Sequence, residues 1–194
     1  MERKGFTLVE LAIVLVIIGL LLGAILKGQE LIQNAKYKRL VSDLQGLEAA
    51  VYTYYDRYKA YPGDDPKAGD RWGSIYSNIV NGNGNGLIEG NPTYTSGDYE
   101  SVLAWRDLRA AGIIPGDPNE ATVTLPSNPY GGRYGFSYRS FGTVTANYIF
   151  VDNVPSDVAK RLDEDLDDGK YNSGSIQASA DYSTRGTVDI YFRL

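Results

Sequence analysis

The sequence of 194 residues contains neither cysteine nor histidine. Without cysteine the chain cannot form disulfides, thiolate metal sites or thiolate nucleophiles. Without histidine it cannot use imidazole ligands or imidazole acid–base catalysis. The net charge of −5 argues against a general nucleic-acid binder, so no nucleic-acid partner is expected. These absences exclude most common hydrolase and metalloenzyme mechanisms.

One long apolar run dominates the N-terminal part of the sequence. Between residues 6 and 26 all but four of the 21 residues are apolar, and the exceptions are Thr7, Glu10, Gly19 and Gly23. A helix of this length spans about 31 Å, the thickness of a bilayer's hydrocarbon core. An acidic side chain there costs about 2.5–3.5 kcal/mol, which makes Glu10 a candidate functional residue. A plain membrane anchor is the alternative, and it gives no reason for Glu10.

The residues KGFTLVE at positions 4–10 resemble the N-terminal signal of type IV pilins and type II secretion pseudopilins. The resemblance implies that a prepilin peptidase cleaves between Gly5 and Phe6, and that Phe6 is then methylated. It also implies that Glu10 matches the acidic residue five positions into the mature chain of that family. The partners implied are other pilin or pseudopilin subunits, the peptidase, the inner membrane and its assembly platform.

The chemistry of the mature N-terminus supports an assembly role for Glu10. After cleavage the α-amine of Phe6 is a cation at the membrane end of a helix, and Glu10 of a neighbouring subunit could neutralise it. Neither charge is tolerable alone in a low-dielectric environment. Farther along, Gly19 and Gly23 form a Gly-x-x-x-Gly step, which favours either close helix packing or local unwinding of the helix.

After residue 27 the pattern becomes amphipathic. Apolar residues repeat with heptad spacing at Tyr37, Leu40, Leu44, Leu47, Val51, Tyr54 and Tyr58. Either a coiled coil or a helix laid on a sheet produces this stripe. We favour the second, because the polar region that follows needs a hydrophobic partner. The chain thus divides into a leader (1–5), a transmembrane half-helix (6–28), an amphipathic half-helix (29–60) and a globular head (61–194).

The head is predicted to contain short helices and short strands. A helix is predicted over about residues 99–111, with Asp98 as its cap, and another runs from a Ser156 cap to about residue 167. Strands are predicted over 134–139 and 144–151, followed by a hairpin of 176–182 and 187–192. The predicted fold class is therefore α+β, with the long N-terminal helix packed on a small antiparallel sheet in a pilin-like arrangement.

Two polar clusters in the sequence are candidate binding sites for calcium as a cofactor. In the first, Asn81, Asn83, Asn85 and Glu89 place oxygen donors at alternate positions of a glycine-rich loop. A solvated Asn-Gly turn is the alternative, and Pro92 stands where a calcium loop carries glutamate. The second cluster comprises Asp163, Glu164, Asp165, Asp167 and Asp168. Its alternative is a solvated acidic face paired with local Lys and Arg.

The sequence leads to a structural, non-enzymatic role. The resemblance implies a pilin or pseudopilin, either a major or a minor subunit, that forms a type IV pilus-like filament. It would be a single-pass inner-membrane protein before assembly and part of a periplasmic or extracellular filament afterwards. A minor pilin acting as a tip adhesin is the alternative, with sixteen tyrosines as a contact surface. A membrane-anchored protein with another role is a third hypothesis.

Overall fold

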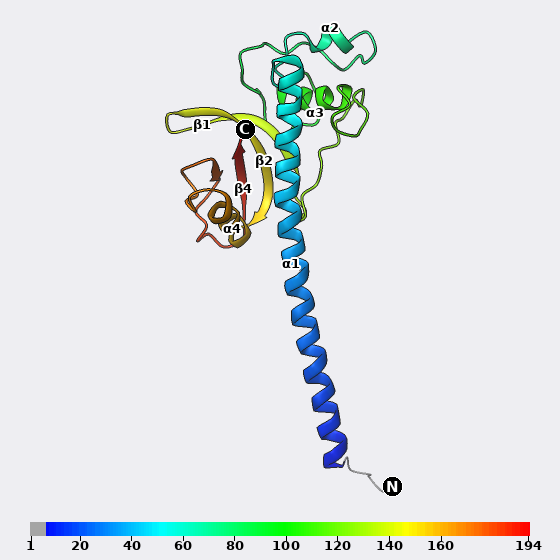
Figure 1. Ribbon diagram of the computed structural model, residues 1–194, viewed down its shortest axis with the longest axis vertical. Coiled ribbons are helices and arrows are strands. Elements are labelled where there is room, and N and C mark those ends of the chain that lie inside the picture. Colours follow the sequence, from blue (N-terminus) through cyan, green and yellow to red (C-terminus); the bar gives the residue numbers. More distant parts are fainter. Residues whose placement is uncertain (1–6) are drawn as a thin grey trace. The chain divides into compact units, whose positions relative to one another are not determined.

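A computed structural model describes residues 7–194, and the chain divides into two units at residue 39 (Figure 1). Each unit is described separately below. The helix α1 (Leu8–Tyr58) contributes its first part to the N-terminal unit and its last part to the head. The helix ends where the sequence predicts, because Lys59 turns to φ 57° and its N–H bonds to the Tyr55 carbonyl at 2.7 Å.

Within the second unit, the last turns of α1 carry the predicted apolar stripe into the core. Leu40, Leu44, Val51 and Tyr54 are each 0% exposed. The hydroxyl of Tyr134, on the first strand of the sheet, also donates a hydrogen bond to Asp43 of the helix at 3.0 Å. Each buried aliphatic side chain stabilises this contact by about 1.5–3 kcal/mol. The stripe is therefore that of a helix packed on the head.

The sheet has four antiparallel strands in the order β1-β2-β4-β3. Their bounds are β1 (Tyr134–Phe141), β2 (Val144–Pro155), β3 (Ile176–Ala178) and β4 (Thr187–Arg193). Phe136 pairs with Ile149, which pairs in turn with Phe192. The register shifts between Val151 and Val154, where Asn153 adopts φ 55° in a β-bulge.

Three short helices complete the head. α3 (Glu100–Ala110) packs against β1, and α4 (Ser156–Leu166) packs against β2, β3 and β4. The Trp105 ring of α3 lies 4.6 Å from the ring of Phe136, and both side chains are fully buried. α2 (Ala68–Trp72) is a single turn inside a loop-rich segment, where no helix is predicted from the sequence. The α+β, pilin-like architecture is confirmed.

Both predicted caps are wrong. Tyr99 stands at the N-cap of α3 in place of Asp98, and Pro155 stands at the N-cap of α4, so that Ser156 is the first helical residue. Neither cap makes a side-chain hydrogen bond to its helix. Carbonyl groups of distant loops instead accept N–H groups at the two helix starts. Ser101 N–H donates to Glu89 O at 2.9 Å, and Ser156 N–H donates to Gly186 O at 3.1 Å.

Candidate functional site

The first turn of α1 holds Glu10 in a capping box. One oxygen of the Glu10 carboxylate accepts the backbone N–H and the hydroxyl of Thr7, each at 2.8 Å. The Glu10 N–H in turn donates to Thr7 Oγ1 at 3.2 Å. Gly5 and Phe6, the predicted processing residues, lie outside the described residues. The carboxylate therefore has a local structural role, besides any role toward a neighbouring subunit.

The N-terminal unit exposes a long, mainly apolar surface. Every residue from 7 to 27 is exposed, and α1 is long and apolar enough to cross a membrane. The helix runs without interruption through Gly19 and Gly23, and a Cβ at either position would meet nothing within 4 Å. Burial of such a surface requires lipid or other helices. Packing and unwinding at the two glycines remain predictions about the assembled state.

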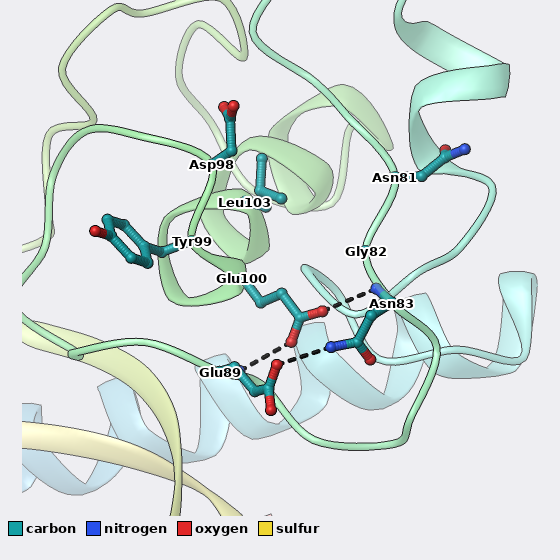
Figure 2. A pocket seen from close by; sticks show the side chains of 8 residues that line it. All are labelled: Asn81, Gly82, Asn83, Glu89, Asp98, Tyr99, Glu100 and Leu103. Carbon is teal, nitrogen blue, oxygen red and sulfur yellow. Dashed lines mark hydrogen bonds between the residues drawn. The ribbon is translucent and has the colours of Figure 1, made fainter.

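The glycine-rich loop brings three of the four predicted calcium residues together, and Figure 2 shows two of them, Asn83 and Glu89. The side-chain amide of Asn83 donates to Glu89 Oε2 at 2.7 Å, and that of Asn85 donates to Glu89 Oε1 at 3.4 Å. Asn81 lies apart from them, because its side chain exchanges hydrogen bonds with Asp70 at 3.2–3.3 Å. The two amides thus turn their NH2 groups toward Glu89, while their oxygens accept the backbone N–H groups of Asn85 and Leu87. A cation beside Glu89 would therefore require both amides to turn, and Asn81 belongs to a different contact.

Two further carboxylates, those of Glu100 and Asp64, complete this region. Glu100 is 6% exposed, and its two oxygens accept the backbone N–H groups of Asn83 and Glu89, each at 2.9 Å. Burial raises the pKa of the Glu100 carboxyl. With Asp98 and Tyr99 these residues line a pocket of about 310 Å³ (Figure 2). The sequence gives no indication of these contacts, because it shows Glu100 only as a residue at the start of a predicted helix.

The second carboxylate, Asp64, fixes the other side of the same loop. Its side chain accepts N–H from Asn85 at 2.9 Å and from Gly86 at 2.7 Å, while its carbonyl accepts N–H from Gly84 at 3.0 Å. Gly84 and Gly86 both adopt positive φ, which allows these successive N–H groups to converge. The backbone N–H groups of the glycine-rich loop thus point toward Asp64.

The acidic cluster at the end of α4 separates into two groups. Glu164 and Asp165 pair along the helix with Lys160 and Arg161, at 3.5 and 3.6 Å, as local compensation predicts. Asp163, Asp167 and Asp168 instead converge, with one oxygen from each within 4.8 Å of the others. These three could hold a metal ion.

The converging carboxylates also have partners within the protein. Asp163 is 0% exposed and accepts the Tyr182 hydroxyl at 2.6 Å and the Gly169 N–H at 3.0 Å. Asp167 accepts backbone N–H groups, including that of Ile176 at 2.9 Å, and Asp168 accepts the Ser173 hydroxyl at 2.6 Å. Burial raises the pKa of the Asp163 carboxyl. These contacts fold the loop after α4 onto the helix end.

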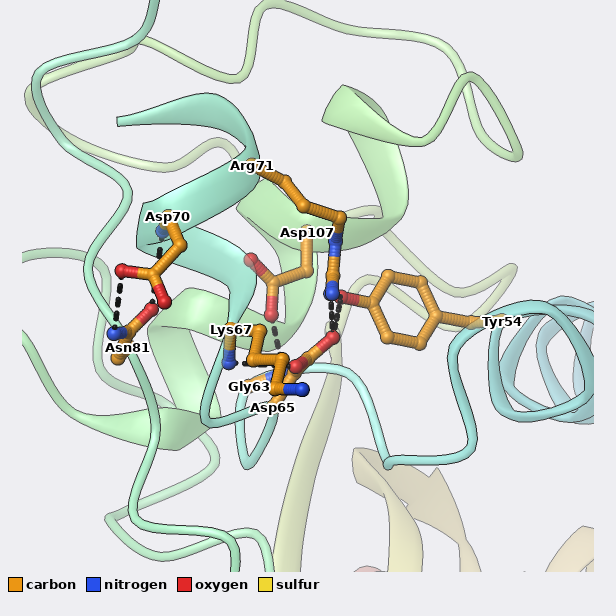
Figure 3. A network of polar contacts seen from close by, with 8 residues as sticks. All are labelled: Tyr54, Gly63, Asp65, Lys67, Asp70, Arg71, Asn81 and Asp107. Carbon is orange, nitrogen blue, oxygen red and sulfur yellow. Dashed lines mark hydrogen bonds and ion pairs between the residues drawn. The ribbon is translucent and has the colours of Figure 1, made fainter. Parts of the chain in front are cut away.

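A polar network joins the end of α1 to α2 and α3 (Figure 3). Asp65, 2% exposed, accepts the Tyr54 hydroxyl at 2.8 Å, pairs with Arg71 of α2 and accepts the Lys67 N–H at 2.9 Å. Beside it, the Gly63 N–H donates to Asp107 of α3 at 2.7 Å. Short contacts of this kind hold residues 61–67 in one conformation.

Comparison with known proteins identifies the class of the N-terminal segment. Residues 1–26 match the prokaryotic N-terminal methylation motif. Over 68 residues the chain is 35% identical to the fimbrial protein of Neisseria meningitidis serogroup B. That region is 34% of this chain and 40% of the relative, so the chain spans less than half of the relative's length. No solved structure matches the chain. Together with the long helix and small sheet, these findings confirm the resemblance to the type IV pilin family: the chain is type IV pilin-like.

Proposed function

We propose that this chain is a structural subunit of a type IV pilus-like filament, inserted in the inner membrane and then packed into the filament through its N-terminal helix. The observation that carries the proposal is the exposed apolar surface of residues 7–27, which is interrupted by a carboxylate at Glu10 and lies almost entirely within the methylation motif matched at residues 1–26. A surface of this kind serves first as a membrane span and then as a helix-packing surface.

Cleavage between Gly5 and Phe6 would create a positive charge that can form an ion pair with Glu10. The new α-amine of Phe6 would be a cation in an apolar environment, and the Glu10 carboxylate of a neighbouring subunit would neutralise it. Removing one member of a buried ion pair costs about 3–5 kcal/mol, because the other charge stays buried alone. At each subunit contact that cost corresponds to a loss of affinity of more than a hundredfold.

The helix-capping role of Glu10 and its negative charge can be tested separately with three variants. Glu10→Gln removes the charge but keeps an oxygen that can accept from Thr7. Thr7→Ala removes the hydroxyl of the cap and keeps the charge. Glu10→Val removes both. Incorporation is measured as the fraction of each variant recovered in filaments sheared from cells that contain the assembly system, relative to the membrane-bound fraction.

Pairing between subunits predicts that Glu10→Gln and Glu10→Val both abolish incorporation, whereas Thr7→Ala keeps it near the wild-type level. Equal incorporation of the wild type and Glu10→Val would contradict the proposed pairing. Loss in Thr7→Ala together with normal incorporation of Glu10→Gln would show that Glu10 acts as a helix cap instead. Membrane insertion of every variant is the internal control.

A further inference from the structure

A second pocket lies where α1 ends, and the proposed assembly role makes no use of it. It encloses about 290 Å³. Its lining comes from the last turn of α1, from the segment that follows and from the glycine-rich loop. Three tyrosines (Tyr55, Tyr58 and Tyr61), two lysines (Lys59 and Lys67) and two aspartates (Asp64 and Asp65) supply most of the lining.

The tyrosine rings form rigid walls. Tyr55 and Tyr61 lie 5.0 Å apart between ring centroids, and the Tyr55 side chain remains 41% exposed. Tyr58 contacts the ring of Tyr54 at 4.6 Å and the edge of Trp72 at 5.3 Å. Aromatic pairs at these separations stabilise one another, so the walls are already formed before any ligand arrives.

The polar part of the pocket is held equally firmly. Asp64 and Asp65 are each 2% exposed. The glycine-rich loop fixes the carboxylate of Asp64, and Tyr54 with Arg71 fixes that of Asp65, as Figure 3 shows for Asp65. The guanidinium of Arg71 lies 4.4 Å from the centre of the Tyr58 ring, which connects this network to the aromatic wall. Each carboxylate oxygen offers two lone pairs, so both residues can accept further hydrogen bonds.

The lysines add donors at the rim. Lys59 adopts φ 57° at the end of α1, a conformation in which glycine or asparagine is usual. Its ammonium group is 2.8 Å from Asp56 in an exposed pair, and such pairs are weak enough to exchange for a ligand. Lys67 is exposed beside Pro66. The pocket therefore combines flat aromatic faces with both donors and acceptors.

We propose that this pocket binds a saccharide. The C–H face of a sugar ring is apolar and stacks on an aromatic ring, while its hydroxyl groups need donors and acceptors around the edge. An apolar ligand would offer no acceptor to the Lys59 and Lys67 ammonium groups that it covered. A nucleic acid would meet a chain of net charge −5. None of the residues that line the pocket lies before residue 55, so the proposal does not rest on the role of the N-terminal helix in filament assembly.

The test uses the full chain, solubilised in a detergent without a sugar headgroup. Glucose, galactose, N-acetylglucosamine and N-acetylneuraminic acid are offered singly at millimolar concentration. Saturation-transfer NMR reports which sugar protons receive magnetisation from the protein. We expect transfer to the ring C–H protons of at least one sugar, as stacking on Tyr55 and Tyr61 requires. No transfer to any of the four sugars would overturn the proposal.

Matched variants assign the signal to the pocket. Tyr55→Ala and Tyr61→Ala should each weaken binding about tenfold, since each removes a stacking face. Tyr55→Phe keeps the ring and should bind within a few-fold of the wild type. Tyr94→Ala is the control outside the pocket, because Tyr94 is likewise 41% exposed and stacks on Tyr99 at 4.7 Å. Equal binding by Tyr55→Ala and the wild type would overturn the assignment, and unchanged melting temperatures show that the variants are folded.

Discussion

Replacement of Asp107 by asparagine should change how the stability of the head depends on pH. Asp107 is 0% exposed in the middle of α3. One carboxylate oxygen accepts the Gly63 N–H, and the other has no hydrogen-bond partner among residues 7–194. The charged groups that act on it are Arg71 of α2 and Arg106 and Glu100 of α3. Burial outweighs these neighbours and raises the pKa of Asp107 to about 7.

The sign and size of the effect follow from linkage. An aspartate in an unfolded chain has a pKa of about 3.9. Between about pH 4 and pH 7 the folded head keeps a proton that the unfolded chain has lost, so its stability falls as the pH rises through this window. Three pH units at 1.36 kcal/mol each amount to about 4 kcal/mol. Asp107→Asn retains the shape and an acceptor for Gly63 and carries no charge, so it should escape this penalty.

The assay is urea unfolding of the full chain in detergent, followed by tryptophan fluorescence at several values between about pH 4 and pH 8. Asp107→Asn and the wild type should be similarly stable near pH 4, and the variant should gain up to about 4 kcal/mol by pH 8. Asp117→Asn is the surface control, because Asp117 is exposed and accepts the nearby Asn119 N–H. A difference between Asp107→Asn and the wild type that does not change with pH would refute the reasoning.

Two other predictions concern close packing and calcium. Gly63→Ala should lower the free energy of unfolding by more than about 2 kcal/mol, because a Cβ there would lie 2.2 Å from the Glu100 carbonyl oxygen. Gly112→Ala, also at positive φ but with open space around it, should cost about 1 kcal/mol, and equal losses in urea unfolding would contradict the close approach. If calcium binds at Glu89 or at the Asp163 cluster, calcium at a hundredfold excess over its dissociation constant stabilises the head by about 2.7 kcal/mol. A melting temperature that neither calcium nor a chelator moves would remove the metal hypothesis.

The long helix and the fold class could be predicted because their signals are local. The heptad stripe ends at Tyr58, and Pro62 with Gly63 prevents its continuation, which is where α1 stops. The caps of α3 and α4 could not be predicted in this way. The N–H groups of Ser101 and Ser156 bond to carbonyl groups of loops distant in sequence, so no capping side chain is required.

The candidate sites show the same division between local and distant contacts. The approach of Asn83 and Asn85 to Glu89 follows from their spacing within one loop. Asp64 and Glu100 reach that loop from outside it, through hydrogen bonds between residues that are 11 to 22 positions apart in the sequence. The sequence also did not predict the burial of Asp107. The apolar residues of α3 indicate one buried face of the helix, whereas residues 100–109 are all buried.

The central claim is that the chain is processed at its N-terminus and then built into a filament. The most direct measurement is the intact mass of the chain recovered from sheared filaments of cells that contain the prepilin peptidase. Processing predicts a chain that has lost residues 1–5 and gained one methyl group, with fragment ions that place the methyl on Phe6. A chain that still begins with Met1, or one that is missing from the filament fraction while abundant in the membrane, would contradict it.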